Sequence, residues 1–232
     1  MWHGNVQDIR EEISTSAPPY SSTKNPYFEK IRSFCGTRCF VNEETENNQT
    51  RWRECFKNYP PELHVEIGCN GGHYLLEKAR LNPKCAFIGI DWKLKQIYKA
   101  SEKANKQHLT NTLFLKANAE RIANIFGQHE IDHLYCFFPD PWPKQSQQKK
   151  RFFTKERLTQ ISNIIKPGGI FEIKTDHEDY YAWILKELQK VKHQWNIIEN
   201  QKDIYKNHPN PSNLKIPEIT LFEKIFIREK KP

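Results

Sequence analysis

The stretch Leu134-Tyr-Cys-Phe-Phe-Pro-Asp-Pro-Trp-Pro-Lys144 joins an apolar run to three closely spaced prolines. An apolar run of this length, bounded by turn signals, predicts a fully buried strand. Each proline fixes its own φ and pushes the residue before it toward an extended conformation, so the segment after the strand cannot be helical. The stretch therefore predicts that Asp140 and Trp142 are held rigidly at the end of a core strand, where open α/β sheets bind their ligands.

Strand and helix patterns alternate on both sides of this stretch, which predicts a mostly parallel sheet with helices on both faces. Strands are expected at 64–68, 86–91, 112–116, 131–138 and 170–175, and helices at 74–81, 94–106, 119–126, 154–165 and 177–191. Two final strands, at 195–199 and 219–228, have no helix between them, so we expect them to pair antiparallel at one edge. A seven-stranded sheet with this ending resembles the Rossmann-like sheet of class I methyltransferases rather than that of a six-stranded dehydrogenase.

The chain before this alternating region has a different composition. Residues 1–26 are polar and interrupted by prolines, which predicts a partly disordered arm. Residues 27–60 show no strong periodicity, and we expect them to form a cap or arm over the main domain. Pro60-Pro61 is a natural boundary, so the expected organisation is an N-terminal segment, 1–60, followed by a methyltransferase domain, 61–232.

Composition sets broad limits on function. The 232 residues carry 36 Lys and Arg against 28 Asp and Glu, a net charge of +8, which favours anionic partners such as nucleic acid or an acidic membrane surface. A soluble protein that is simply rich in lysine would look the same. No apolar run reaches the ~18 residues needed to span a bilayer, so we expect a cytoplasmic protein that does not use a membrane. The six cysteines are expected to be reduced structural thiols, and no spacing among them predicts a metal site.

A glycine-rich turn follows the first expected strand of the alternating region. It reads Glu66-Ile-Gly-Cys-Asn-Gly-Gly72, which fails the dinucleotide pattern G-x-G-x-x-G but fits the methyltransferase pattern E-x-G-x-G-x-G with Asn70 at the second glycine. Asparagine tolerates positive φ almost as well as glycine, so this departure is mild. Asp91 ends the second strand, where a carboxylate can accept both hydroxyl protons of a ribose. Asn118 follows the third strand and is either a helix N-cap or a contact to the adenine of a cofactor.

Four segments together resemble the bacterial tRNA (guanine-N7-)-methyltransferase family. They are the glycine-rich turn, Phe138-Pro-Asp-Pro-Trp-Pro-Lys144, Thr175-Asp176 and Thr220-Leu-Phe-Glu223, and the resemblance covers residues 31–228. The Pro-Asp-Pro-Trp core is its most specific part. The resemblance implies S-adenosylmethionine as methyl donor and, as acceptor, N7 of guanine 46 in the variable loop of tRNA.

The resemblance also implies roles for individual residues. The cofactor would be bound by Glu66, Gly68, Asp91, Asn118 and Asp140, and Asp140 would also be the catalytic residue. The tRNA guanosine would be contacted by Lys144, Asp176, Thr220, Leu221, Phe222 and Glu223. The protein would act as a monomer or a homodimer.

One departure from the family lies in the basic run after the prolines. The family commonly has Lys-x-Arg-His-x-Lys-Arg-Arg, whereas this chain has Lys144-Gln-Ser-Gln-Gln-Lys-Lys-Arg151. Lys149, Lys150 and Arg151 remain, and we expect them to contact the RNA backbone through changed contacts. The alternative is a solvated charged loop.

The chemistry of guanine fits this interpretation. N7 carries an in-plane lone pair in the neutral base, so no general base is required and the enzyme has a positioning task. Asp140 would accept hydrogen bonds from the N1–H and N2–H groups of the base. Trp142 either stacks on the base, as aromatic side chains do with unpaired bases, or packs in the core. Thr175 with Glu178 fits a helix capping box, and ligand contact by Asp176 is an equally good interpretation of the same turn.

Two other functions fit the sequence. The first is a nonenzymatic RNA-binding protein on a degenerate methyltransferase sheet, which would not bind S-adenosylmethionine. The second is a class I methyltransferase with a non-tRNA substrate. It would show no salt-dependent affinity for tRNA, whereas four phosphate contacts would give a log–log salt slope of roughly −3.

Overall fold

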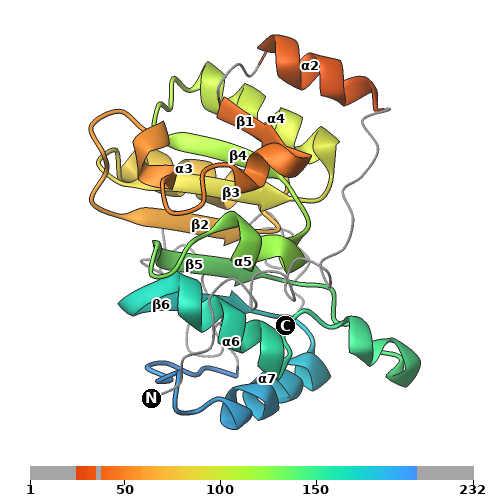
Figure 1. The fold of residues 1–232 in the computed structure, drawn as a ribbon. Coiled ribbons are helices and arrows are strands. Elements are labelled where there is room, and N and C mark those ends of the chain that lie inside the picture. The colour runs from red at the N-terminus through yellow and green to blue at the C-terminus, as the bar shows by residue number, and fades with distance from the viewer. Residues whose placement is uncertain (1–24, 35–37, 203–232) are drawn as a thin grey trace, which may run out of the picture.

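A computed structural model describes residues 25–34 and 38–202 and centres on a six-stranded sheet (Figure 1). All neighbouring strands are parallel, and their order is β1-β4-β3-β2-β5-β6. The strands are β1 (Cys39–Val41), β2 (Leu63–Ile67), β3 (Ala86–Asp91), β4 (Thr112–Lys116), β5 (Ile131–Phe137) and β6 (Ile165–Lys174). The strand order reverses between β2 and β5, and ligands of open α/β sheets bind at such a switch point.

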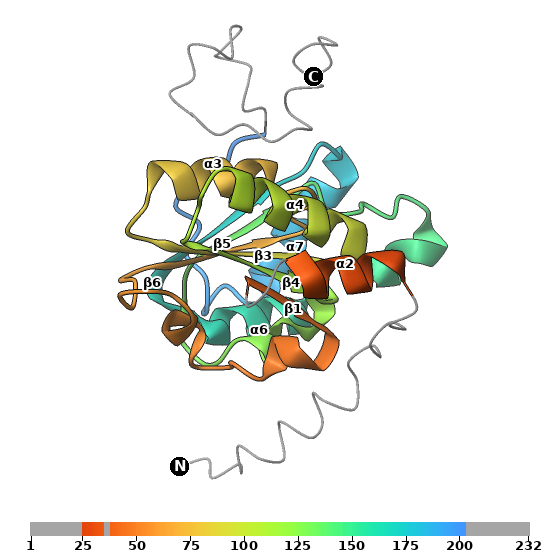
Figure 2. The same ribbon diagram turned by 90° about the horizontal axis from the view of Figure 1, so that it is seen from above.

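Helices cover both faces of this sheet, as the alternating pattern predicts. They are α2 (Pro26–Phe34), α3 (His73–Leu81), α4 (Leu94–Lys106), α5 (Ile122–Ile125), α6 (Lys155–Ile164) and α7 (Glu178–Lys190). Figure 2 shows α3 and α4 on one face and α6 on the other, while Figure 1 shows α7 beside α6 near the β6 edge. This is the parallel α/β sheet with helices on both faces that the sequence predicts.

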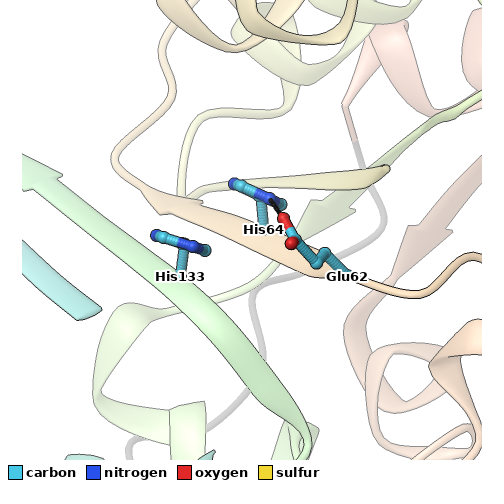
Figure 3. Close-up of side chains that lie close together, drawn as sticks. All are labelled: Glu62, His64 and His133. Carbon is cyan, nitrogen blue, oxygen red and sulfur yellow. Dashed lines mark hydrogen bonds and ion pairs between the residues drawn. The ribbon is translucent and has the colours of Figure 1, made fainter. Parts of the chain in front are cut away.

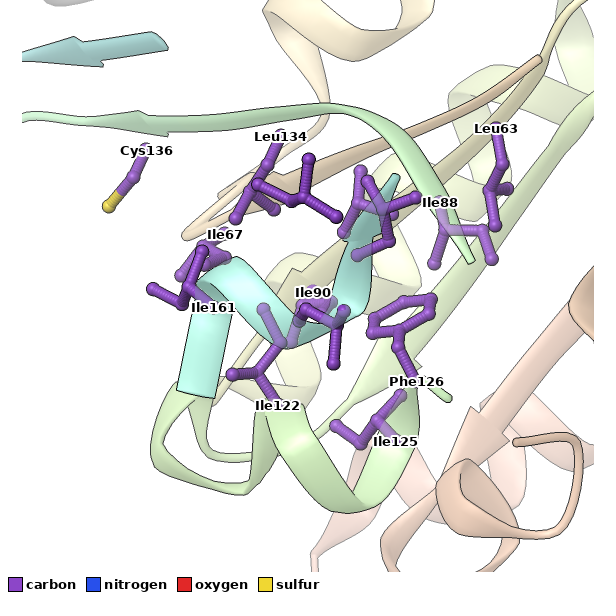
Figure 4. Packing of buried hydrophobic residues seen from close by; sticks show 14 of the residues in the cluster. Leu63, Ile67, Ile88, Ile90, Ile122, Ile125, Phe126, Leu134, Cys136 and Ile161 are labelled. Atoms are coloured by element: carbon purple, nitrogen blue, oxygen red, sulfur yellow. The ribbon is translucent and has the colours of Figure 1, made fainter. Parts of the chain in front are cut away.

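The larger core lies between the sheet and the layer that contains α5 and α6 (Figure 4). Alternate residues of β3 show how it forms, because Ile88 and Ile90 point into this core while Phe87 joins the smaller core under α3 and α4. Burial of each such side chain contributes about 1.5–3 kcal/mol. Apolar packing on both faces leaves only the strand ends free for polar, functional side chains.

The segment before β2 belongs to the same core. Trp52 is fully buried, and its Nε1 donates a hydrogen bond to the Ile125 carbonyl at 2.8 Å. The buried Glu130 carboxylate accepts from the backbone N–H groups of Thr50 and Trp52, each at 2.9 Å. Residues 39–56, assigned to a cap from sequence, thus supply β1 and part of the main core.

Two strand assignments differ from the sequence-based prediction. The strand predicted at 195–199 is wrong, because these residues have no regular structure and Trp195 instead packs its ring 5.8 Å from that of Phe171. β1 was missed because three residues are too few to show an alternating pattern. The described part of the sheet therefore has six strands instead of seven. The strand predicted at 219–228 lies outside the described residues. So does the arm predicted over residues 1–26, except for its last two residues.

Smaller differences concern element ends. β6 begins at Ile165, directly after α6, and includes the Pro167-Gly-Gly169 turn predicted to precede it. A register irregularity between β5 and β6 near His133 accommodates these residues. Within the described residues, five cysteines are free thiols and no helix has the length and apolar character to cross a membrane.

Candidate active site

The carboxyl ends of β2, β3 and β5 meet at one edge of the sheet. Ile67, the last residue of β2, pairs with Ile90 of β3 on one side and Cys136 of β5 on the other. Gly68, the first glycine of the turn, comes one residue after Ile67, Asp91 one residue after Ile90, and Asp140 four residues after Cys136. The sheet register therefore places three of the predicted sites at neighbouring strand ends, at the switch point.

The glycine-rich turn has the backbone conformation that its sequence predicts. Gly68, Asn70 and Gly72 have φ values of +74°, +48° and +71°, respectively, so Asn70 adopts the left-handed conformation expected of a glycine substitute. A Cβ on Gly72 would lie 2.9 Å from that of Ala100, whereas a Cβ on Gly68 would meet nothing within 4 Å. Gly72 thus permits close packing of α3 on α4, and Gly68 leaves open space at the strand end.

Glu66 is a buried acid directly below this turn. The pKa of its carboxyl is raised to about 8, mainly by burial and in smaller part by nearby Asp91, against the opposing effect of a hydrogen bond donated by the Leu75 N–H. Its second oxygen, Oε2, has no hydrogen-bond partner among the described residues. A buried polar atom of this kind is costly unless a ligand satisfies it, which makes Glu66 a candidate ligand contact.

Asp91 is half-buried and holds the turn in place. Its Oδ2 accepts from the Asn70 N–H at 2.9 Å and its Oδ1 from the Lys93 N–H at 2.7 Å. Burial raises the pKa of the Asp91 carboxyl, and these two backbone donors limit the increase. Each oxygen retains a lone pair, so the carboxylate can still accept from two hydroxyl groups.

Trp92 is an exposed aromatic residue at this edge that the sequence-based interpretation missed. Its side chain is 46% exposed, and the Lys116 Nζ lies 4.1 Å from the ring centroid. Its position was the signal that could have identified it, because Trp92 directly follows Asp91, the acid that ends β3. Asn118, two residues after the end of β4, is the N-cap of a short 3₁₀ helix, with its Oδ1 accepting from the Glu120 N–H at 2.9 Å. The N-cap role is confirmed for Asn118, and its predicted adenine contact stays a prediction.

The proline-bracketed loop after β5 differs from its predicted conformation. Phe138 and Trp142 both precede prolines, and extended backbone was expected, but their φ values are +51° and +45°. Positive φ is rare for bulky residues and indicates strain that the surroundings must compensate. The Phe138 N–H donates to the Lys174 carbonyl at 2.8 Å, which continues the β5–β6 pairing into the loop. Asp140 follows this fixed point, is exposed, and makes no hydrogen bond or ion pair with any described residue.

Arg151 has a different role from the predicted RNA-backbone contact. It is only 4% exposed, and its Nε donates to the Pro141 carbonyl at 2.8 Å. Its guanidinium carbon lies 5.2 Å from the Tyr180 ring centroid and 4.9 Å from that of Trp183. A side chain buried in this way cannot reach a surface phosphate, so the assignment of Arg151 is corrected. Arg151 instead anchors the strained loop to α7.

The lysines before Arg151 are exposed, as the RNA-binding prediction requires. Lys149 and Lys150 are the last two residues of η5 (Gln145–Lys150), a 3₁₀ helix that projects from the body of the domain in both Figure 1 and Figure 2. Lys144 is its N-cap residue, Lys149 is exposed, and the Lys150 Nζ lies 4.9 Å from the centroid of the half-buried Trp142 ring. The cation–π contact connects the basic segment to the proline-bracketed loop.

The turn after β6 also differs in detail. The N-cap of α7 is His177, whose Nδ1 accepts from the Tyr180 N–H at 3.4 Å, so the capping box predicted for Thr175 and Glu178 is wrong. The Thr175 Oγ1 accepts from the His177 N–H at 3.3 Å instead. Asp176 is exposed at this turn. Thr220, Leu221, Phe222 and Glu223 lie outside the described residues.

The groups at this edge fit S-adenosylmethionine. The cofactor offers ribose hydroxyl donors, a positively charged sulfonium and a positively charged amino group. The edge offers two carboxyl groups, one with an unsatisfied buried oxygen, and open space at Gly68. Carboxylates accept hydrogen bonds from hydroxyl and ammonium groups and stabilise positive charge.

Comparison with known proteins agrees with this chemistry. The family described as "Putative methyltransferase" matches residues 61–232. A tRNA (guanine-N(7)-)-methyltransferase of Christiangramia forsetii is 32% identical over 88% of this chain and 94% of its own length, and one of Enterococcus faecalis is 34% identical over 65% and 70%. A bifunctional glycosyltransferase/methyltransferase of Fusobacterium nucleatum is 28% identical over 90% of this chain, which spans only 31% of that longer protein. The chain belongs to this methyltransferase family, together with the tRNA (guanine-N(7)-)-methyltransferases.

Proposed function

We propose that the protein transfers the methyl group of S-adenosylmethionine to N7 of the variable-loop guanine of tRNA. The observation that carries this proposal is the register of β2, β3 and β5, which brings the glycine-rich turn, Asp91 and the Pro-Asp-Pro-Trp loop to one edge. Membership of the family that includes tRNA (guanine-N(7)-)-methyltransferases supports the choice of acceptor.

Cofactor binding is proposed for five residues at this edge. Asp91 accepts hydrogen bonds from the ribose hydroxyls, and Glu66 places its carboxyl near the positively charged part of the molecule. Gly68 provides space, Asn118 borders the adenine, and Asp140 closes the site from β5. The bound cofactor supplies an electrophilic methyl group on a sulfonium.

The protein's part in the reaction is alignment of the base. Asp140 accepts hydrogen bonds from the N1–H and N2–H groups of guanine and turns N7 toward the methyl carbon. No proton has to leave N7 before it attacks, so positioning rather than base catalysis lowers the barrier. The rigid attachment of the loop by Arg151 and the Phe138 N–H limits the movement of Asp140. Loss of charge at sulfur during transfer is favoured where water is excluded.

Recognition of the tRNA is proposed for residues around the same edge. Lys144 and Asp176 contact the guanosine, as does the segment Thr220 to Glu223. Lys149 and Lys150 contact the RNA backbone, and burial of Arg151 removes it from that group. We also propose that the protein acts in the cytoplasm, where its substrate is made, as a monomer or homodimer.

The direct test uses unmodified tRNA transcripts with S-adenosylmethionine, followed by nucleoside mass spectrometry. The expected product is N7-methylguanosine in stoichiometric amount. A matched transcript made with 7-deazaguanosine, which lacks the acceptor nitrogen, should take up no methyl group. Methylation of the deaza transcript, or of a different base, would refute the proposed acceptor.

Two binding measurements separate the alternatives. Equilibrium dialysis with labelled S-adenosylmethionine distinguishes an enzyme from a nonenzymatic RNA-binding protein, which would retain no cofactor. The salt dependence of tRNA affinity distinguishes a tRNA substrate from another acceptor, because phosphate contacts release counterions. With Lys149 and Lys150 as the two proposed contacts to the RNA backbone, the expected log–log slope is about −1.5.

A further inference from the structure

A second group of ionisable side chains lies at the opposite end of β2 and β5 (Figure 3). His64 is the second residue of β2 and pairs in register with His133 of β5. The two imidazole rings are stacked, with centroids 4.5 Å apart and planes 7° apart. Glu62, just before β2, places its Oε2 3.0 Å from the His64 Nε2. One ligand atom from each of these three residues lies within 4.8 Å of the other two.

The surroundings of His64 prepare it to act as a metal ligand. Its side chain is buried, and its Nδ1 lies 2.9 Å from the Tyr135 hydroxyl. Metal-binding histidines usually form a hydrogen bond through the nitrogen that does not touch the metal, which fixes the ring orientation. The Tyr135 hydroxyl occupies that position for His64.

A thiol lies beside this group of three. The Cys85 Sγ is 3.6 Å from the Glu62 Oε2, in the loop before β3, but it is not among the ligand atoms that lie within 4.8 Å of one another.

We propose that Glu62, His64 and His133 bind a divalent transition-metal ion of the zinc type, with Cys85 as the fourth ligand. Nitrogen, sulfur and carboxylate oxygen are the ligands of tetrahedral zinc sites. Bonds of 2.0–2.1 Å place such ligands roughly 3.3 Å apart, so the three clustered atoms, which lie within 4.8 Å of one another, must approach by up to about 1.5 Å, and the Cys85 Sγ must move toward them. Exposed Glu62 and half-buried His133 can make this movement by side-chain rotation, while His64 stays fixed by Tyr135.

The metal would stabilise the fold and take no part in methyl transfer. His64 precedes Gly68 by four residues of extended chain, roughly 13 Å, and the active-site edge lies beyond Gly68. The four ligands come from β2, β5 and the loop before β3, so one ion would connect three segments. A closed, four-ligand site of this kind is typical of structural zinc. Ordinary packing of a buried histidine between Glu62 and Tyr135 is the alternative that the experiment must exclude.

The test uses the full-length, tag-free protein, because a polyhistidine tag binds the same cations. The zinc content after equilibrium dialysis against micromolar Zn²⁺ should be one ion per chain. His133→Gln and Glu62→Gln should each weaken zinc binding about tenfold or more, and His193→Gln, at an exposed position outside the cluster, should not. Zinc should raise the melting temperature of the wild type and have less effect on the two ligand variants.

A spectroscopic measurement on the unmodified protein covers the case in which the variants fold poorly. Cobalt(II), bound in place of zinc, should give the intense visible absorption of a tetrahedral site and a sulfur-to-metal charge-transfer band. Cys85→Ser should remove the charge-transfer band, whereas Cys55→Ser should leave it unchanged. Absence of stoichiometric zinc from the wild type, or unchanged binding in both His133→Gln and Glu62→Gln, would overturn the proposal.

Discussion

The two ends of the paired strands β2 and β5 differ in backbone conformation. At the amino end, His64 and His133 face each other across regular backbone, and their arrangement follows directly from strand register. At the carboxyl end, Gly68, Asn70, Phe138 and Trp142 all have positive φ, and the chain leaves the sheet in two tight turns. Regular pairing can stack side chains, but a pocket for a cofactor requires the backbone to turn away from the sheet. Two bulky residues with positive φ, Phe138 and Trp142, lie in the segment that makes this turn after β5.

A similar contrast separates two adjacent basic residues. Lys150 is exposed and lies over Trp142, whereas Arg151 is buried between Tyr180 and Trp183 and bonded to the Pro141 carbonyl. Lysine suits a solvated contact to phosphate, while the planar guanidinium combines ring stacking with a directed hydrogen bond. One basic run therefore contains both the lysines that we propose contact RNA and an anchor for the loop that carries Asp140.

The largest effect is expected from Asp140→Asn. The carboxamide cannot accept from both the N1–H and N2–H groups of guanine, so kcat/KM for tRNA should fall about 100-fold or more. Asp179→Asn, an exposed acid on α7, is the matched control and should retain activity. Full turnover by Asp140→Asn with unchanged cofactor affinity would exclude the proposed role.

Arg151→Lys should have the next largest effect. Lysine keeps the charge but loses the bond to Pro141 and the stacking on two rings, so the free energy of unfolding should decrease by about 2 kcal/mol. Methyl transfer should fall about tenfold because the loop that carries Asp140 becomes mobile. Chemical denaturation and initial-rate measurements check both values, with Lys192→Gln, at an exposed position outside the proposed sites, as a neutral control. An unstable variant with normal kcat and KM would limit Arg151 to a structural role.

The buried Glu66 predicts a pH effect of moderate size. Because its pKa of about 8 exceeds the ordinary 4.5, the folded protein retains a proton that the unfolded chain has lost. Its contribution to stability is therefore complete below pH 4.5 and lost as the pH rises toward 8.

Cofactor affinity should change in the opposite direction, because the ionised Glu66 carboxylate attracts the positively charged ligand. Calorimetry should show affinity rising about tenfold from pH 6 to pH 8 and then levelling. Glu66→Gln should remove both trends, and an unchanged pH profile in this variant would contradict the assignment.

The smallest effect concerns salt dependence. Lys149→Gln and Lys150→Gln should each reduce the magnitude of the log–log salt slope for tRNA binding by about 0.7–0.9. Arg151→Lys should leave the slope unchanged, since neither side chain would contact phosphate from the interior. If Arg151→Lys reduced the salt slope as much as Lys150→Gln does, Arg151 would contact the RNA backbone, as the sequence predicted.

The sequence predicted those features that depend on local pattern. β3, α4 and β4 have the predicted ends, because strong periodicity and turn residues bound them on both sides. Asn70 was correctly expected at positive φ, because its place in the glycine pattern required it. The three-residue β1 was missed because its pairing with β4 is a long-range contact with no local signal.

The errors at the site have the same origin. Burial of Arg151 depends on Tyr180 and Trp183, which lie about thirty residues further along the chain, so its charge alone suggested a surface role. Phe138 and Trp142 were expected to be extended because local preference before proline favours it, and tertiary contacts override that preference. Glu62, His64 and His133 could not be recognised as a group, because a separation of about seventy residues is unlike any metal-binding motif.

Hydrogen–deuterium exchange with and without S-adenosylhomocysteine tests most directly whether the carboxyl end of the strand pair is the cofactor site. The account predicts slower exchange in the segments 66–72, 91–93 and 138–144. Residues at the amino end, 62–64 and 131–133, should exchange at unchanged rates. Protection confined to the amino end, or no protection of 138–144, would contradict the placement of Asp140 beside the cofactor.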